Sequence, residues 1–198
     1  MGRNDGNPGS KALSNDNNGS QEKTGGTRAS QGVMRILSAA HLAEGAHPEL
    51  SELEFGIIVA SNAFQRWITR CMAAAGAREL GPTDILVLHH VHHRGRGKRL
   101  ADICFTLNYE DTHVVNYALK KLVSVGLIEG KRGGKEVFYA TTEPGADLLA
   151  RFRGVRNECL LQSVDSELDD AQELARIASR LRFLSGIYDQ AARAASSL

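Results

Sequence analysis

The residues of this 198-residue chain best suited to chemistry are polar and aromatic side chains that recur at helical spacing between positions 109 and 121. Val115, Ala118, Leu119 and Leu122 follow the spacing i, i+3, i+4 and i+7, which predicts the buried stripe of a helix over about 110–125. Neutral hydrogen-bonding groups can contact base edges and lysines can contact phosphates, so a face that combines them fits a DNA surface. The alternative is an ordinary surface helix of a bundle. The face opposite the stripe holds Tyr109, His113, Asn116, Tyr117 and Lys120, with Lys121 at its edge and Thr112 nearer the stripe.

Basic charge concentrates on both sides of this predicted helix. The segment 94–135 holds nine basic and four acidic residues, a net charge of +5, whereas the rest of the chain has a net charge of −4. Neutralising phosphates provides most of the non-specific affinity for DNA, so we expect these cations to hold phosphates or to enter the minor groove. The alternative is that these basic residues belong only to a solvated loop. The basic residues are Arg94, Arg96, Lys98, Arg99, Lys120, Lys121, Lys131, Arg132 and Lys135.

Two shorter helices are predicted to precede this one. Gly81-Pro82 opens a helix that runs to about His93, because Pro at a first-turn position loses no hydrogen bond. The Gly-rich segment Arg94–Arg99 is expected to be a turn, and the second helix follows it over 99–107.

After the third helix the hydrophobic period changes from 3.6 to 2. Gly126 is expected to end the helix in a left-handed conformation. Two strands are predicted over 127–132 and 135–142, and Gly133-Gly134 between them predicts a type I′ turn with positive φ at both glycines. Three short helices followed by a hairpin is the element order of a winged helix-turn-helix.

Long helices are predicted on both sides of this unit. The capping-box sequence Ser51–Glu54 opens a helix over about 51–75, and a shorter helix is expected over 33–43. Thr142 is expected to cap a further helix, and the last helix should cover about 165–195. Their apolar seams exceed what one small domain can cover, which favours a symmetric helical dimer over a monomer folded on itself.

These elements together predict a mainly α fold with a small β-hairpin wing. The first 30 residues are rich in Gly, Asn and Ser and contain only four apolar residues, which is typical of a disordered tail. The expected parts are a disordered tail (1–32), N-terminal dimerisation helices (33–79), a winged helix-turn-helix DNA-binding domain (80–142) and C-terminal dimerisation helices (143–198).

The chain resembles the MarR-type family of winged-helix transcription regulators over about residues 50–190. The resemblance implies an obligate homodimer on a pseudo-palindromic operator, with the recognition helix in the major groove and the wing in the minor groove. For many members it also implies release of the DNA when a small, often phenolic, effector binds. The motifs are weak one by one and fairly specific together: LGPTDILVL at 80–88, LADI at 100–103, VNYALKKL at 115–122, GLI at 126–128 and TEPG at 142–145.

Two features depart from the family pattern. Family wings commonly carry an Asp-Arg pair that steadies a groove-reading arginine, whereas the tip here is Arg132–Lys135 and lacks the Asp. The connection before the recognition helix, Phe105–Asp111, is also expected to be a few residues longer than usual.

Other chemistries find less support. We expect no enzymatic activity and no cofactor, because there is no Ser-His-Asp order, paired carboxylate motif, dinucleotide fingerprint or P-loop. His89 and His93 have the i, i+4 spacing of metal ligands, but a third ligand is missing and we expect no metal site. The apolar runs are too short for a membrane span. Cys71, Cys104 and Cys159 are widely spaced, which favours a reducing cytoplasm, and they are expected to be buried and unreactive.

The sequence thus favours a cytoplasmic, homodimeric regulator of transcription that binds double-stranded DNA, most simply as a repressor. In this hypothesis Tyr109, Thr112, His113, Asn116 and Tyr117 face bases, and the nine basic residues hold phosphates or the minor groove. The competing hypothesis is a winged-helix adaptor, in which the same helix and hairpin bind a protein partner.

Overall fold

The computed structural model describes residues 47–161, 164 and 170–198. The predicted tail over 1–32 and the predicted helix over 33–43 lie outside the described residues. Internal contacts divide the chain into two units, 1–55 and 56–198, and the three short helices and the hairpin all belong to the second.

Helix α2 (Pro48–Ala74) begins three residues before the predicted start. Ser51 lies inside the helix, so the predicted capping box is wrong; Pro48 takes the first-turn position, where its missing N–H costs no hydrogen bond. The buried residues of α2 lie near its C-terminal end and include Ile68 and Met72, whereas Phe64 is 51% exposed.

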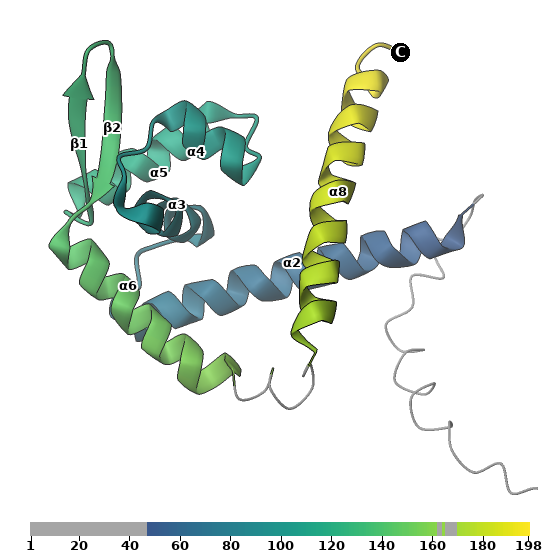
Figure 1. Cartoon of the computed structure of the whole chain (residues 1–198), viewed down its shortest axis with the longest axis horizontal. Helices are drawn as coiled ribbons and strands as arrows, with labels where there is room; N and C mark the ends of the chain where they lie inside the picture. The colour runs from purple at the N-terminus through teal and green to yellow at the C-terminus, as the bar shows by residue number, and fades with distance from the viewer. Residues whose placement is uncertain (1–46, 162–163, 165–169) are drawn as a thin grey trace, which may run out of the picture. The chain divides into compact units, whose positions relative to one another are not determined.

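Helices α3 (Pro82–His92), α4 (Leu100–Leu107) and α5 (Thr112–Ser124) form the predicted three-helix unit, which Figure 1 shows gathered beside the hairpin. The predicted stripe of α5 is confirmed, because all four of its residues are at most 1% exposed in the common core. The turn between α4 and α5 consists of the four residues 108–111. Asn108 closes α4 in the left-handed region, at φ 55°.

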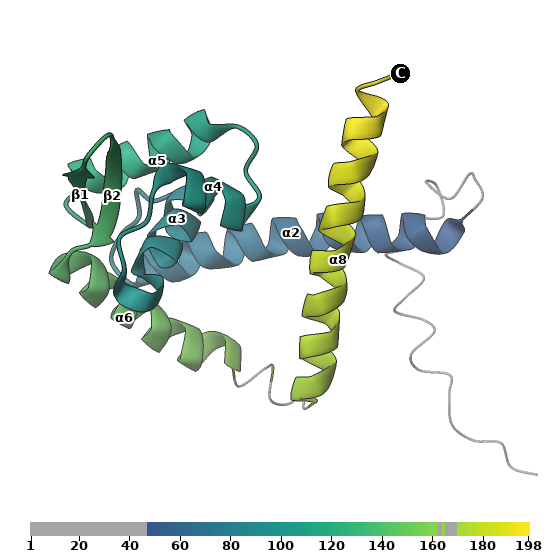
Figure 2. The same ribbon diagram turned by 45° about the horizontal axis from the view of Figure 1, so that its top comes forward.

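The wing is an antiparallel hairpin of β1 (Ile128–Gly133) and β2 (Glu136–Thr141) that projects from the three helices (Figures 1 and 2). Gly133 pairs with Glu136, so the two turn residues are Gly134 and Lys135 rather than the two glycines. Of these two turn residues, only Gly134 has positive φ, at 66°. Glycine is needed at position 133 for a steric reason, because a Cβ there would lie 2.8 Å from the ring of Phe138.

The segment before α4 forms an isolated β-bridge to the hairpin that the sequence did not reveal. A 3-10 turn (His93–Gly95) follows α3, and the chain then extends. Lys98 bridges Tyr139 with two backbone hydrogen bonds of 2.9 Å, one from each amide to the other residue's carbonyl. The predicted turn over Arg94–Arg99 is therefore extended in its second half, and the bridge ties β2 to the start of α4.

The base of the hairpin is closed by the start of α6 (Glu143–Arg156). Thr142 caps this helix as predicted, accepting from the Gly145 amide at 3.3 Å. The Thr142 amide donates to the Leu127 carbonyl at 3.1 Å, and its hydroxyl donates to the Gly126 carbonyl at 2.7 Å. Gly126 has φ 74°, which confirms the predicted left-handed helix end.

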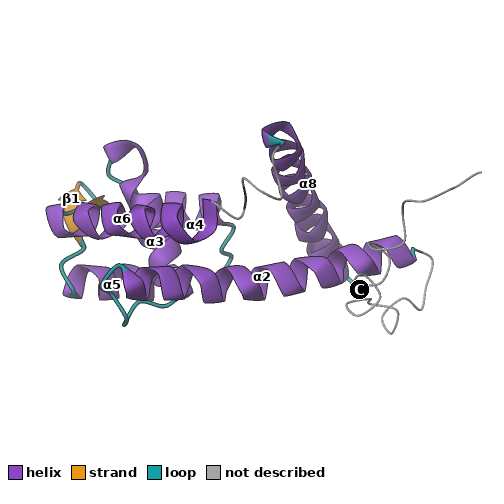
Figure 3. Ribbon diagram, turned by 90° about the horizontal axis from the view of Figure 1, so that it is seen from below, coloured by secondary structure: helices purple, strands orange, loops and turns teal. Residues whose placement is uncertain are grey.

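The helices that follow differ in part from the prediction. A π-helical segment (Asn157–Leu161) extends α6. The last helix, α8 (Ala171–Ala195), starts later than predicted, because Asp170 has extended backbone angles and caps the amide of Gln172 at 2.8 Å. The mainly α fold with a hairpin wing is confirmed, and Figure 3 shows strand only at the hairpin. None of the helices in the described part of the chain is both long and apolar enough to cross a membrane.

Candidate nucleic-acid interface

The outward face of α5 carries most of the residues that were predicted to read bases. Asp111 caps the helix by accepting from the His113 amide at 2.8 Å, which fixes the first turn. Thr112, His113 and Lys120 are exposed, Tyr117 is 72% exposed, and Asn116 is half-buried. These hydrogen-bonding groups therefore lie opposite the buried stripe, where a partner can reach them.

Tyr109 does not join this face. It lies before α5, packs against the core and shares a hydrogen bond of 3.2 Å between its hydroxyl and that of Thr83 on α3. Its amide donates to the Cys104 carbonyl at 2.9 Å, as part of the turn that joins α4 to α5. The structure thus gives Tyr109 contacts within the helix-turn-helix.

Lys121 also turns inward. Its ammonium donates to the carboxylate of Asp84 at 2.6 Å and to the carbonyl of Glu79 at 2.6 Å. Asp84 is 6% exposed and accepts in addition from the Gly81 amide at 2.9 Å, at the start of α3. This buried acid ties α5 to α3. In the sequence, Asp84 is recognisable only as an acid in the first helical turn after Gly81-Pro82. Its pairing with Lys121 is not, because the two residues lie 37 positions apart.

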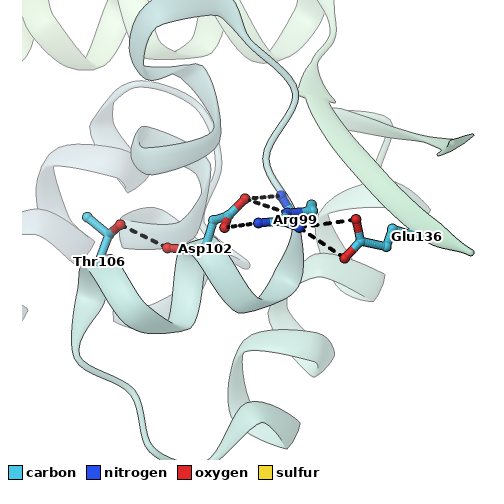
Figure 4. Close-up of polar contacts among 4 residues, drawn as sticks. All are labelled: Arg99, Asp102, Thr106 and Glu136. Atoms are coloured by element: carbon cyan, nitrogen blue, oxygen red, sulfur yellow. Dashed lines mark hydrogen bonds and ion pairs between the residues drawn. The ribbon is translucent and has the colours of Figure 1, made fainter.

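Two further cations of the basic set are paired with acids. Lys131 contacts Glu129 on the same strand at 2.6 Å. Arg99 binds Asp102 of α4 and Glu136 of the hairpin (Figure 4). The other six cations of the set take part in none of the ion pairs within the described residues. They are Arg94, Arg96, Lys98, Lys120, Arg132 and Lys135.

These six cations are not all close together. Arg132 and Lys135 are exposed at the tip of the hairpin, and Lys120 is exposed on α5. Arg96 instead lines a cleft with Thr141 and Ala146, at the other end of β2 from the turn. The structure therefore groups the tip cations separately from Arg96.

The histidines near the end of α3 do not form a shared metal site. His89 points inward and meets the ring of Phe152 edge-on, with ring centroids 4.7 Å apart, and its buried Nε2 has no hydrogen-bond partner. His93 is exposed and has extended backbone angles beyond the helix end. Among the described residues there is no group of three or more His, Cys, Asp or Glu side chains that could hold a metal ion.

The position of His89 predicts an acid-sensitive fold. Burial lowers the pKa of His89 below its usual 6.5, and the nearby His92, Arg153 and Arg156 lower it further. The folded state therefore resists taking up a proton that the unfolded chain binds below about pH 6.5, so stability should be greatest above that pH and fall as the pH drops toward the folded-state pKa.

We expect His89→Leu to weaken this loss of stability on acidification. One shifted group changes the free energy of unfolding by up to about 1.4 kcal/mol per pH unit within its titration range. Urea unfolding of both proteins between pH 7.5 and pH 5 measures the difference. If the free energy of unfolding falls equally steeply with decreasing pH in the variant and in the parent protein, the prediction is contradicted. Some dependence should remain, because burial also lowers the pKa of His90.

The cysteines differ in exposure. Cys71 and Cys104 are buried, as expected, whereas Cys159 is exposed, so that expectation is wrong for Cys159. Cys159 lies in the π-helical segment after α6, where no buried residue is found. Burial raises the pKa of the Cys104 thiol, which disfavours the reactive thiolate.

Comparisons with known proteins point to the same region. A family model described as a winged helix DNA-binding domain matches residues 80–145. No curated protein matches the chain by sequence. A MarR transcriptional regulator from Methanosarcina mazei Go1 has a TM-score of 0.55 and 20% identity over 69% of this chain and 96% of its own.

Two other solved structures share the fold. A MarR family regulator from Neisseria meningitidis has a TM-score of 0.58 and 20% identity over 72% of this chain and 94% of its own. The transcriptional repressor CouR, bound to a 23-mer DNA duplex, has a TM-score of 0.57 and 21% identity over 72% of this chain and 99% of its own. The matched residues 80–145 run from the start of α3 to the first turn of α6.

Proposed function

We propose that this chain, a winged-helix protein with the fold of the MarR-type regulators, is a sequence-specific DNA-binding regulator of transcription. The observation that carries the proposal is the polar outward face of α5, which lies in the segment that matches a winged helix DNA-binding domain. An outward helix of this kind enters the major groove in winged helix-turn-helix proteins.

The contacts divide into two kinds. Thr112, His113, Asn116 and Tyr117 are proposed to contact bases, because their neutral donors and acceptors can discriminate base edges. Lys120 and the five other unpaired cations are proposed to contact phosphates or the minor groove. The proposal does not include Tyr109, Arg99, Lys121 and Lys131, because their polar groups are engaged within the protein.

A second copy of the chain is proposed to cover the apolar residues of α8. None of its residues is buried, and Leu174, Ile177, Leu181 and Ile187 are 37–46% exposed. A two-fold dimer brings the same surface from both copies together. It would also place two α5 helices about 34 Å apart, one turn of DNA, which suits a pseudo-palindromic operator.

Repression and effector release form the finer part of the proposal. CouR, which shares the fold, is described as a transcriptional repressor bound to DNA. A dimer whose two recognition helices must match two half-sites is sensitive to small changes in their separation, so a small molecule bound between domains could release it.

The decisive experiment is selection of genomic DNA with the purified full-length chain, followed by mobility-shift titration in moderate salt. Specific retardation at nanomolar protein supports the regulator, and a stoichiometry of two chains per site supports the dimer. Equal, weak retardation of all DNA would instead favour the protein–protein adaptor.

Two substitutions on α5 should separate base reading from phosphate binding. Asn116→Ala should lose about 1–3 kcal/mol of discrimination at the base pair it contacts, with little change for unrelated DNA. Lys120→Ala should weaken binding to every sequence and reduce the slope of log K against log salt by about one, the value expected for a single phosphate. Fluorescence anisotropy over a salt series measures both.

The exposed Arg193 near the end of α8 offers a charge-matched control. Arg193→Ala removes one positive charge outside the proposed DNA interface and beyond the apolar residues of α8, and it should leave the salt slope unchanged. Equal effects of Asn116→Ala and Lys120→Ala on every DNA would refute the proposed division of contacts.

A further inference from the structure

The guanidinium of Arg99 lies between two carboxylates from different parts of the domain (Figure 4). Asp102, on α4, accepts from its Nε at 2.9 Å and from its Nη2 at 2.7 Å. Glu136, the first residue of β2, accepts from its Nη1 at 3.1 and 3.2 Å. All three guanidinium nitrogens therefore donate within the protein, in the forked geometry that suits two carboxylates.

The two acids hold Arg99 between the start of α4 and the tip of the hairpin. Arg99 is the residue before α4, and Asp102 holds it there by accepting from its amide as well as from its side chain. Glu136 follows the two-residue turn of the hairpin directly. Because Lys98 already pairs with Tyr139, adjacent residues of one segment hold β2 at two separate points.

The charges argue against Arg99 as a phosphate ligand. Asp102 and Glu136 together outweigh its single positive charge, so the cluster is net negative at the edge of a basic surface. The hydrogen bonds from Arg99 lower the pKa of Asp102, which keeps this carboxylate ionised. An exposed acid at the wing tip would repel DNA if Arg99 left it to bind a phosphate.

We propose that Arg99 is a positioning residue for the wing: it fixes the hairpin tip against α4, so that Arg132 and Lys135 meet the DNA in register with α5. The inference rests on the proposed function, and it assigns Arg99 a different role from that of the unpaired cations. The cluster of Arg99, Asp102 and Glu136 thereby couples wing contacts to the helix-turn-helix.

Amide hydrogen exchange on the free protein tests whether the cluster of Arg99, Asp102 and Glu136 fixes the hairpin tip, without any DNA. Arg99→Lys keeps the charge but loses the fork, and Glu136→Gln removes one carboxylate. Both should speed exchange at the amides of residues 131–136 about twofold to fivefold, the range that an exposed ion pair supports. Exchange at the buried α5 amides should not change.

Glu129→Gln is the matched control, because it makes the same chemical change on the hairpin but breaks an ion pair within a single strand. It should leave exchange at the tip as in the parent protein. Unchanged exchange at the tip in both Arg99→Lys and Glu136→Gln would overturn the proposal, whether or not the chain binds DNA.

A second experiment measures the affinity for operator and non-operator DNA. Glu136→Gln should keep or increase affinity for non-operator DNA, because it removes a negative charge, yet lower the ratio of operator to non-operator affinity about fivefold. A direct phosphate ligand would behave differently: freeing Arg99 would raise both affinities together, and that result would overturn the proposal. If the parent protein selects no operator, the proposed function fails, but the hydrogen-exchange experiment still decides whether Arg99 fixes the hairpin tip.

Discussion

Replacing Gly145 with alanine should lower the free energy of unfolding by about 3 kcal/mol. Gly145 is buried in the first turn of α6, and a Cβ there would overlap the Leu127 carbonyl oxygen and lie 2.9 Å from Cγ2 of Thr141. The same carbonyl accepts from the Thr142 amide, so relief by moving the backbone would break the hydrogen bond that closes the hairpin. Urea unfolding followed by circular dichroism measures the loss.

The same helix provides the control. Gly154 is exposed, and a Cβ there would meet nothing within 4 Å. Gly154→Ala should therefore stabilise the protein by up to about 1 kcal/mol, through helix propensity alone. If Gly145→Ala were as well tolerated as Gly154→Ala, the close approach of α6 to Leu127 would be wrong.

The second large effect is expected at Asp84. Asp84→Ala removes the hydrogen bond to the Gly81 amide and the contact with Lys121, and it leaves the ammonium without its acid. Losing one partner of a fully buried ion pair costs about 3–5 kcal/mol. Because the Lys121 side chain is 29% exposed, water can replace part of the contact, and we expect about 2 kcal/mol.

A double-mutant cycle separates the two interactions of Asp84. Lys121→Ala alone should cost less than Asp84→Ala, because the hydrogen bond to Gly81 remains. The coupling energy between the two substitutions should be about 1 kcal/mol. Fully additive effects would mean that Asp84 acts only through the start of α3 and that Lys121 is available to other partners.

Local signals were sufficient to predict most of the helix-turn-helix. The stripe on α5, the left-handed Gly126 and the Thr142 cap each depend on residues within one or two helical turns, and the structure confirms all three. The side chains between the stripe residues were correctly placed on the outward face for the same reason, with the exception of Lys121.

What the sequence did not reveal depends on contacts between distant segments. The acid partner of Lys121 lies 37 residues before it, and the partner of Arg99 on the hairpin lies 37 residues after it. Spacing along the chain contains no information about such pairs until the fold brings them together. The bridge between Lys98 and Tyr139 could not be predicted for a related reason, since a single bridging pair leaves no alternation of residue types to detect.

The closed base of the hairpin has a consequence for the substitutions that the wing can tolerate. Gly126, Leu127 and Thr142 hold the two ends of the wing together through two hydrogen bonds, independently of the residues at the tip. Arg132 and Lys135 at the tip are exposed, whereas Ile128 is buried in the core and Tyr139 packs against it. The tip can therefore accept substitutions at these two positions while the strands that carry it keep their core contacts.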